Sequence, residues 1–148
     1  MRALFYRFIV PLISAVLLTS CVSVQNASPS QRGLASGPPG PGKVKIFVYR
    51  PTRFLSGGLV HRVFIDGRLL GSNASGTFLV AEVDPGHHIV TAGYDQHDLD
   101  AQAGQSHYYN QTVWMAMYDP STATGLEEVS ASEGRRGVSK CKQAANAF

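Results

Sequence analysis

Short apolar segments separated by turn signals fill the chain from residue 43 onward. From Lys43 to Arg50 the side chains alternate with a period of two, which places Val44, Ile46 and Val48 on one face of an expected strand. Asp66-Gly67, between two apolar segments, is the strongest hairpin signal. By the same criteria we expect strands at residues 43–50, 59–65, 68–71, 77–83, 88–92, 98–102 and 106–117.

The spacing of these strands restricts the fold to a small set. A turn signal occurs about every ten residues, and no helical pattern alternates with the strands, which argues against a parallel α/β sheet. We therefore predict an all-β domain, an antiparallel β-sandwich of the immunoglobulin or prealbumin kind.

The C-terminal residues predict a short helix packed on this sheet. Ser130 to Glu133 has the spacing of a capping box. Gly134 and Gly137 weaken the helix by about 1 kcal/mol each relative to alanine. Apolar residues recur at intervals of three and four at Ala131, Gly134, Val138, Cys141 and Ala145.

Residues 1–20 have the parts of an export signal in the expected order. Arg2 and Arg7 supply positive charge, and an apolar stretch runs from Phe8 to Leu18. This stretch is shorter than the roughly 18 apolar residues expected of a membrane-spanning helix. Leu18-Thr19-Ser20-Cys21, which follows, resembles the lipobox of bacterial lipoproteins.

The resemblance to lipoproteins implies a processed and acylated N-terminus. The signal would be cut before Cys21, whose thiol would carry a diacylglycerol. We expect this covalent lipid and no other cofactor, with the membrane as a partner through the anchor. In enteric-type bacteria, an aspartate directly after the lipidated cysteine favours retention in the inner membrane. This chain has Val22 at that position instead. The expected location is therefore the bacterial cell envelope, facing the periplasm, at the outer membrane rather than the inner.

The residues between Cys21 and the first strand differ from the rest in composition. Residues 22–42 are rich in serine, proline and glycine, which predicts a flexible tether with a reach on the order of 25 Å. The expected organisation is a signal peptide at 1–20, the lipidated cysteine and tether at 21–42, and the β-sandwich with its terminal helix at 43–148.

The charge balance argues against a nucleic-acid partner. The whole chain has 13 basic and 10 acidic side chains. Removal of the signal takes away Arg2 and Arg7, so 13 − 2 leaves 11 basic against 10 acidic side chains. Nucleic-acid binding requires a much stronger, clustered excess of positive charge.

Five short motifs follow one another along the chain. They are Phe47-Val48-Tyr49-Arg50-Pro51, Val63 to Gly71, Glu82 to His88, Ala103 to Tyr109 and Val138 to Cys141. In this order they resemble a family of small bacterial lipoproteins, the domain of unknown function 2846 family. The second and third also resemble the shorter PEGA repeat, a small envelope β module. The resemblance covers roughly residues 43–142 and implies a β-sandwich lipoprotein with no known activity.

A search for catalytic or metal-binding patterns yields little. No histidine pair has helical i, i+4 spacing, and no Cys-x-x-Cys accompanies the histidines, so we predict no zinc or copper site. The acidic segment Asp95 to Asp100 lacks the pattern of a calcium loop and is expected to be a solvated edge. Cys141, on the apolar stripe of the helix, is expected to be buried and inert. We therefore predict that the chain is not an enzyme. The five histidines are His61, His87, His88, His97 and His107.

The aromatic strand near residue 110 offers a candidate binding surface. Tyr108, Trp114 and Tyr118 share one face by strand alternation. If the terminal helix covers this face it is core; if not, it could bind sugar rings or a protein. The loop after the first strand adds Arg50 and Arg53, which could receive an anion.

These observations favour two functions. The first is a lipid-anchored, non-catalytic interaction or structural module of the envelope, with an unidentified envelope protein as partner. The alternative is a sensor domain that binds a small molecule or a glycan. The sequence assigns neither an oligomeric state nor a pairing of Cys141 between chains.

Overall fold

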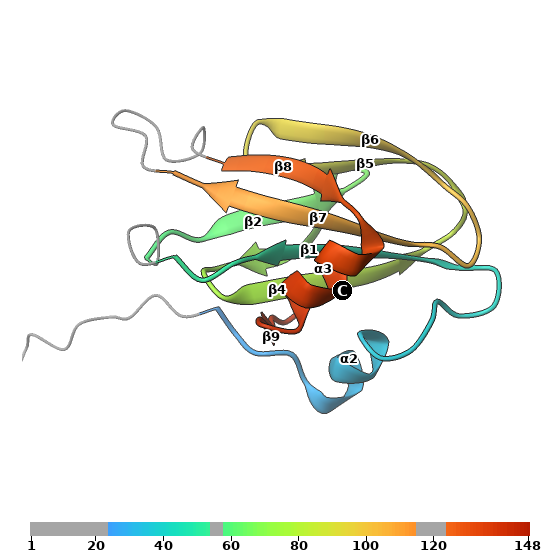
Figure 1. The fold of residues 1–148 in the computed structure, drawn as a ribbon, viewed down its shortest axis with the longest axis horizontal. Helices are drawn as coiled ribbons and strands as arrows, with labels where there is room; N and C mark the ends of the chain where they lie inside the picture. Colours follow the sequence, from blue (N-terminus) through green and yellow to red (C-terminus); the bar gives the residue numbers. More distant parts are fainter. Residues whose placement is uncertain (1–23, 54–57, 115–123) are drawn as a thin grey trace, which may run out of the picture.

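The fold is a sandwich of two β-sheets with helices on one side (Figure 1). The computed structural model describes residues 24–53, 58–114 and 124–148. The predicted signal peptide, Cys21 and Tyr118 lie outside the described residues. The strands are β1 Val44–Arg50, β2 His61–Ile65, β3 Arg68–Asn73, β4 Thr77–Val83, β5 Gly86–Ala92, β6 Asp95–Ala101, β7 Ser106–Val113, β8 Thr124–Val129 and β9 Lys142–Gln143.

One sheet has five strands in the order β8-β7-β1-β4-β9, and the other has four in the order β3-β2-β5-β6. The predicted all-β sandwich with a short C-terminal helix is confirmed. The five-stranded sheet is mixed rather than wholly antiparallel, because β1 pairs in parallel with β7 and β4 in parallel with β9. The chain crosses to the other sheet for β5 and β6 and returns to the first sheet as β7, alongside β1.

Strand β1 lies in the middle of the five-stranded sheet and is buried along its whole length. Its inner face contributes Val44, Ile46 and Val48 to the core between the two sheets. Its outer face contributes Phe47 and Tyr49 to a second apolar cluster beneath the helices. The structure therefore has two cores that share one strand.

Helix α3, Ala131–Val138, covers the outer face of this sheet (Figure 1). The side chain of Ser130 caps it by accepting from the backbone N–H of Glu133 at 3.3 Å. A Cβ at Gly134 would overlap the ring of Tyr108, and one at Gly137 would overlap the ring of Tyr49. The two glycines, expected only to weaken the helix, allow it to approach the aromatic face closely.

Residues 24–42 pack on the domain, so the prediction of a flexible tether is wrong for this segment. The backbone N–H of Ala27, a buried residue, donates to the carbonyl of Gln143 at 3.0 Å. Helix α2, Pro29–Leu34, follows with a complete capping box between Ser28 and Gln31. The buried Lys45 ammonium donates to the carbonyl of Ser36 at 2.9 Å. These bonds offset the ordering entropy that the composition of the segment implies.

We expect Gly134→Ala to lower the free energy of unfolding by about 1–3 kcal/mol, because the added methyl group overlaps the Tyr108 ring. The matched control is Gly33→Ala in α2, where nothing lies within 4 Å of an added Cβ. The control should be neutral or stabilising by up to about 1 kcal/mol, because alanine favours a helix. Denaturant unfolding of both variants is the measurement. Equal effects in the two helices would contradict the packing role of Gly134.

Candidate functional site

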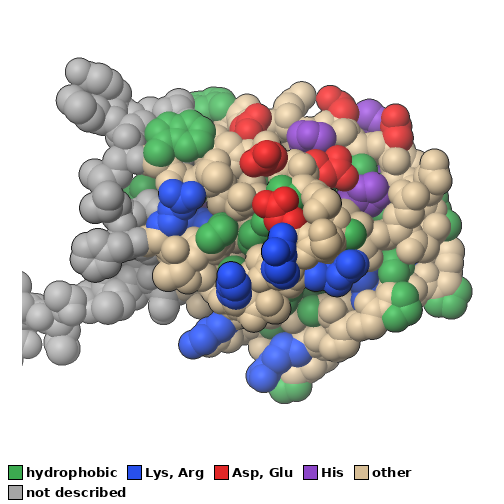
Figure 2. Space-filling view, viewed as in Figure 1, with side chains coloured by type: hydrophobic (Ala, Val, Ile, Leu, Met, Phe, Trp, Pro, Cys, Tyr) green, Lys and Arg blue, Asp and Glu red, His purple; other side chains and the backbone are tan. Residues whose placement is uncertain are grey.

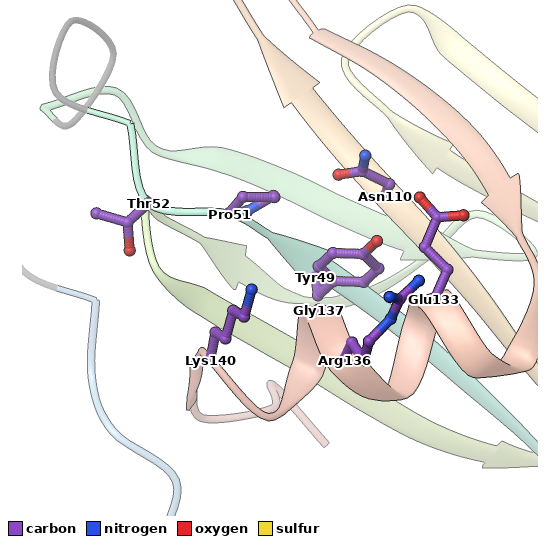
Figure 3. A pocket seen from close by; sticks show the side chains of 8 residues that line it. All are labelled: Tyr49, Pro51, Thr52, Asn110, Glu133, Arg136, Gly137 and Lys140. Carbon is purple, nitrogen blue, oxygen red and sulfur yellow. The ribbon is translucent and has the colours of Figure 1, made fainter.

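A groove of about 460 Å³ lies between α3 and the ends of β1 and β7 (Figure 3). Strand β1 supplies Tyr49, and the residues just after this strand supply Pro51 and Thr52. Strand β7 supplies Asn110. The exposed side of α3 and the residues after it form the other wall. The lining residues of this helix groove are Tyr49, Pro51, Thr52, Asn110, Glu133, Arg136, Gly137 and Lys140.

Tyr49 forms the floor of the helix groove. Its ring packs beneath Gly137, and its hydroxyl points toward the side chains of Asn110 and Glu133 (Figure 3). Burial, reinforced by the negative charge of Glu133, raises the pKa of Tyr49. The phenol is therefore neutral at physiological pH and can donate a hydrogen bond to a bound group.

Asn110 contributes an acceptor that the protein leaves unused. Its Oδ1 atom is buried and has no hydrogen-bond partner among the described residues. A buried polar atom without a partner is unfavourable by about 1–3 kcal/mol, so a donor would be stabilised there once the Asn110 side chain turns its shielded oxygen toward the groove. The Asn110 amide thus adds a specific point of recognition to the groove.

The rim of the helix groove combines charges of both signs. Arg136 and Lys140 are exposed cations, and Glu133 is an exposed carboxylate one turn before Arg136. Together with the Tyr49 hydroxyl, they can hold an anionic or mixed-charge polar group through several hydrogen bonds. The arrangement is thus suited to binding.

The structure separates the residues of the predicted binding surface. Arg50 and Tyr108 are buried, so both are wrong as surface residues. The guanidinium of Arg50 donates from Nη1 to the carbonyl of Leu59 at 2.6 Å. Tyr108 stacks on Phe47 with 4.8 Å between ring centroids, under α3.

The remaining predicted residues have different positions. Arg53 is exposed, and Trp114 is 53% exposed with its ring beside Gly125. Neither of them lines the helix groove. The fifth residue, Tyr118, lies outside the described residues.

Sequence reasoning missed Tyr49, Asn110 and the polar side of α3 as site residues. One signal for them was present. Two glycines three residues apart in a predicted helix, Gly134 and Gly137, indicate close packing on bulky side chains. Strand β1 carries such a pair of aromatic side chains, Phe47 and Tyr49. The loop after β1, for which the sequence predicts an anion site at Arg50 and Arg53, contributes Pro51 and Thr52 to the groove lining.

The histidines are distributed over separate contacts. His107 Nδ1 lies 2.8 Å from Glu128 Oε1, and His87 lies within 3.2 Å of both Asp98 and Asp100. Within residues 24–53, 58–114 and 124–148, no group of three His, Cys, Asp or Glu side chains is arranged to hold a metal ion. The Cys141 thiol is half-buried, and burial raises its pKa, which lowers its reactivity.

Fold and groove together define a class of protein, a small two-sheet β module with a helix-bordered surface groove. The family model described as protein of unknown function (DUF2846) matches residues 41–126, more than half of the chain. The chain belongs to the DUF2846 family. It is also similar to an uncharacterized protein of Haemophilus influenzae, with 25% identity over 136 residues covering 88% of this chain and 79% of that protein. No solved structure matches.

Both helices in the described ranges are too short to cross a lipid bilayer.

His88 and Asp66 stabilise the hairpin turn that joins β2 and β3. Asp66 has the positive φ of 53° that this turn requires, and its Oδ1 accepts from the backbone N–H of Ile89 at 2.8 Å. Its Oδ2 lies 2.7 Å from Nδ1 of His88, whose Nε2 lies 2.8 Å from the carbonyl of Asp84. Burial opposes protonation of His88, but these two bonds outweigh it and raise its pKa.

We expect the stabilisation from His88 to depend on pH. Because its folded pKa is raised above the unfolded value of about 6.5, the stabilisation is full below that pH and is lost as pH rises through the folded pKa. His88→Gln should therefore destabilise the protein more at about pH 5.5 than at about pH 8.5. Chemical denaturation at both pH values measures this. Asp66→Asn should abolish the same pH-dependent part of the stability, because it removes the carboxylate that His88 contacts. A His88→Gln effect that does not vary with pH would contradict the assignment.

Proposed function

We propose that this chain is a lipid-anchored module of the bacterial cell envelope that acts by binding and not by catalysis. The lipobox ending at Cys21 supports the anchor, and Val22 supports the outer membrane, with the domain facing the periplasm.

The helix groove is the observation that carries the binding role. Its polar side chains come from β1, β7 and α3, and they converge on a space that is open to solvent along one side (Figure 3). A small ligand usually has most of its surface enclosed, whereas an open groove accommodates a segment of another chain. The preferred occupant is a polar, acidic segment of an envelope protein, paired with Arg136 and Lys140.

A sensor of small anionic molecules or glycans is the second candidate. The volume of about 460 Å³ falls within the range of small-molecule sites. The Tyr49 hydroxyl is a group that sugar hydroxyls can engage, and the Asn110 oxygen becomes a second one when its side chain turns toward the groove. This candidate uses the same groove and differs only in the size of the occupant.

Cys21→Ala tests the anchor. We expect the variant to appear as an unprocessed precursor or to leave the membrane fraction, since it has no thiol to receive the diacylglycerol. Fractionation of cells, with mass measurement of the N-terminal peptide, reads both outcomes. Cys141→Ala is the control and should remain processed and membrane-bound. Normal processing and retention of the Cys21→Ala protein would contradict the lipoprotein assignment.

Site-specific photocrosslinking tests the groove. A photoreactive residue at the exposed position 52, on the groove rim, should capture an envelope protein in intact cells, and one at the exposed position 102 should not. Tyr49→Phe keeps the packed ring but removes the hydroxyl, and we expect it to reduce the capture about fivefold or more, the loss of one good hydrogen bond. Tyr94→Phe, at a 75% exposed tyrosine outside the groove, is the matched control.

The outcome of that experiment separates the two candidates. A reproducible protein adduct that Tyr49→Phe weakens supports the interaction module. Capture of glycan fragments alone supports the sensor. Equal capture from positions 52 and 102, or no effect of Tyr49→Phe, contradicts the assignment of the groove as the binding site.

A further inference from the structure

Five exposed cations lie together on one side of the domain, whereas the exposed Arg53, Arg62 and Arg68 lie in the loop after β1 and on β2 and β3. Figure 2 shows Lys and Arg gathered over α3, β9 and α2, whereas Asp, Glu and His gather on the other side of α3. Glu133, which lines the groove, lies in the first turn of α3, at the end away from the basic last turn. The exposed cations of this basic face are Arg32, Arg135, Arg136, Lys140 and Lys142.

The cations of the basic face are available for an external partner. In the part of the chain that the structure describes, none of the five lies within salt-bridge distance of a carboxylate. Glu133 is the exposed carboxylate on α3. The other exposed carboxylates of the described residues lie on β6 and β8, at Asp98, Asp100, Glu127 and Glu128, and in turns, at Asp66 and Asp84. A chain that is nearly neutral after loss of its signal therefore has one strongly basic side.

The N-terminal segment joins the domain at this same side. The backbone N–H of Ala27 donates to the carbonyl of Gln143, the residue that follows Lys142. The carbonyl of Ala27 accepts from Nε of Arg32 at 3.3 Å. The carbonyl of Gln25 accepts from the backbone N–H of Ala145 at 2.8 Å. The chain that leads back to Cys21 thus leaves the domain beside two cations of the basic face.

Very little chain separates this point from the proposed lipid. Val24, the first described residue, is three positions after Cys21, and three residues span at most about 11 Å. The Debye length is about 8–10 Å at physiological ionic strength. Because this connection is short, a lipid on Cys21 would keep the domain close to the bilayer and let the adjoining cations approach its surface to within that distance.

We propose that the basic face binds the anionic phospholipid headgroups of the membrane that holds the anchor. The two acyl chains of the expected diacylglycerol would hold the protein at the membrane, and the basic face would add charge attraction that orients the domain on the surface. The proposed lipidation decides only which membrane the basic face meets. Its charge complementarity to anionic headgroups depends on the described cations alone.

Vesicle co-sedimentation tests the basic face without the lipid. The probe is the chain from Cys21 onward, made without residues 1–20 and therefore not acylated. Both cores and all of the hydrogen bonds described above lie within residues 24–148, so this chain contains the complete fold. We expect binding to vesicles of phosphatidylcholine mixed with phosphatidylglycerol, little binding to pure phosphatidylcholine, and loss of binding in high salt.

A pair of matched double variants locates the binding. Arg135→Gln/Lys142→Gln removes two cations that do not line the helix groove, and should lower the partition coefficient roughly 30-fold, about fivefold for each cation. Gln96→Glu/Gln102→Glu makes the same change in net charge at exposed positions on or just after β6, and should change it less than about threefold.

Three results would overturn the proposal. They are equal binding to neutral and anionic vesicles, equal losses in the two double variants, and binding to isolated peptidoglycan but not to vesicles. A failure of the anchor would appear in the fractionation of Cys21→Ala and leave the vesicle result unchanged. A failure of the groove would appear in the crosslinking at position 52, so the three assignments fail separately.

Discussion

Burial of β1 on both faces is the constraint on which the rest of the structure depends. The strand has aliphatic side chains toward the opposite sheet and aromatic side chains on the outer face. A sandwich normally exposes the outer face of each sheet, but the stacked rings of Phe47 and Tyr108 would leave a large apolar surface in water. Helix α3 removes that surface, and the glycines of α3 make the contact close. The helix groove forms where this cover ends, beside Tyr49.

The sequence predicts strands well where side chains alternate and turns bound them. Residues 77–83 are expected as a strand and form β4 with the same limits, and the Asp66-Gly67 turn occurs as expected. Strand β9 and its pairing with β4 have no local signal, because two residues carry no periodicity and are held by tertiary contacts. Helix α2 did have a local signal, Ser28 followed by Pro29 and Gln31, but the serine, proline and glycine content around it suggested a coil.

The site was harder to predict than the fold because burial depends on partners distant in the sequence. A charged residue such as Arg50 is expected at the surface, yet it is buried with a backbone carbonyl as acceptor. Tyr108 was placed correctly on one face of its strand, and only the packing of α3 decides that this face is core. Asn110 follows from no motif, because its significance is an acceptor that the folded chain leaves without a donor.

The pairing of the two ends of the domain has a consequence for the order of folding. Ala27 is bonded to Gln143, Gln25 to Ala145, and the carbonyl of Leu70 accepts from the N–H of Ala147. A polypeptide emerges from the ribosome with its N-terminus first, so residues 25–27 are made long before residues 143–145, to which they bond. Docking of the N-terminal segment is therefore a late step, which follows the formation of most of the two sheets.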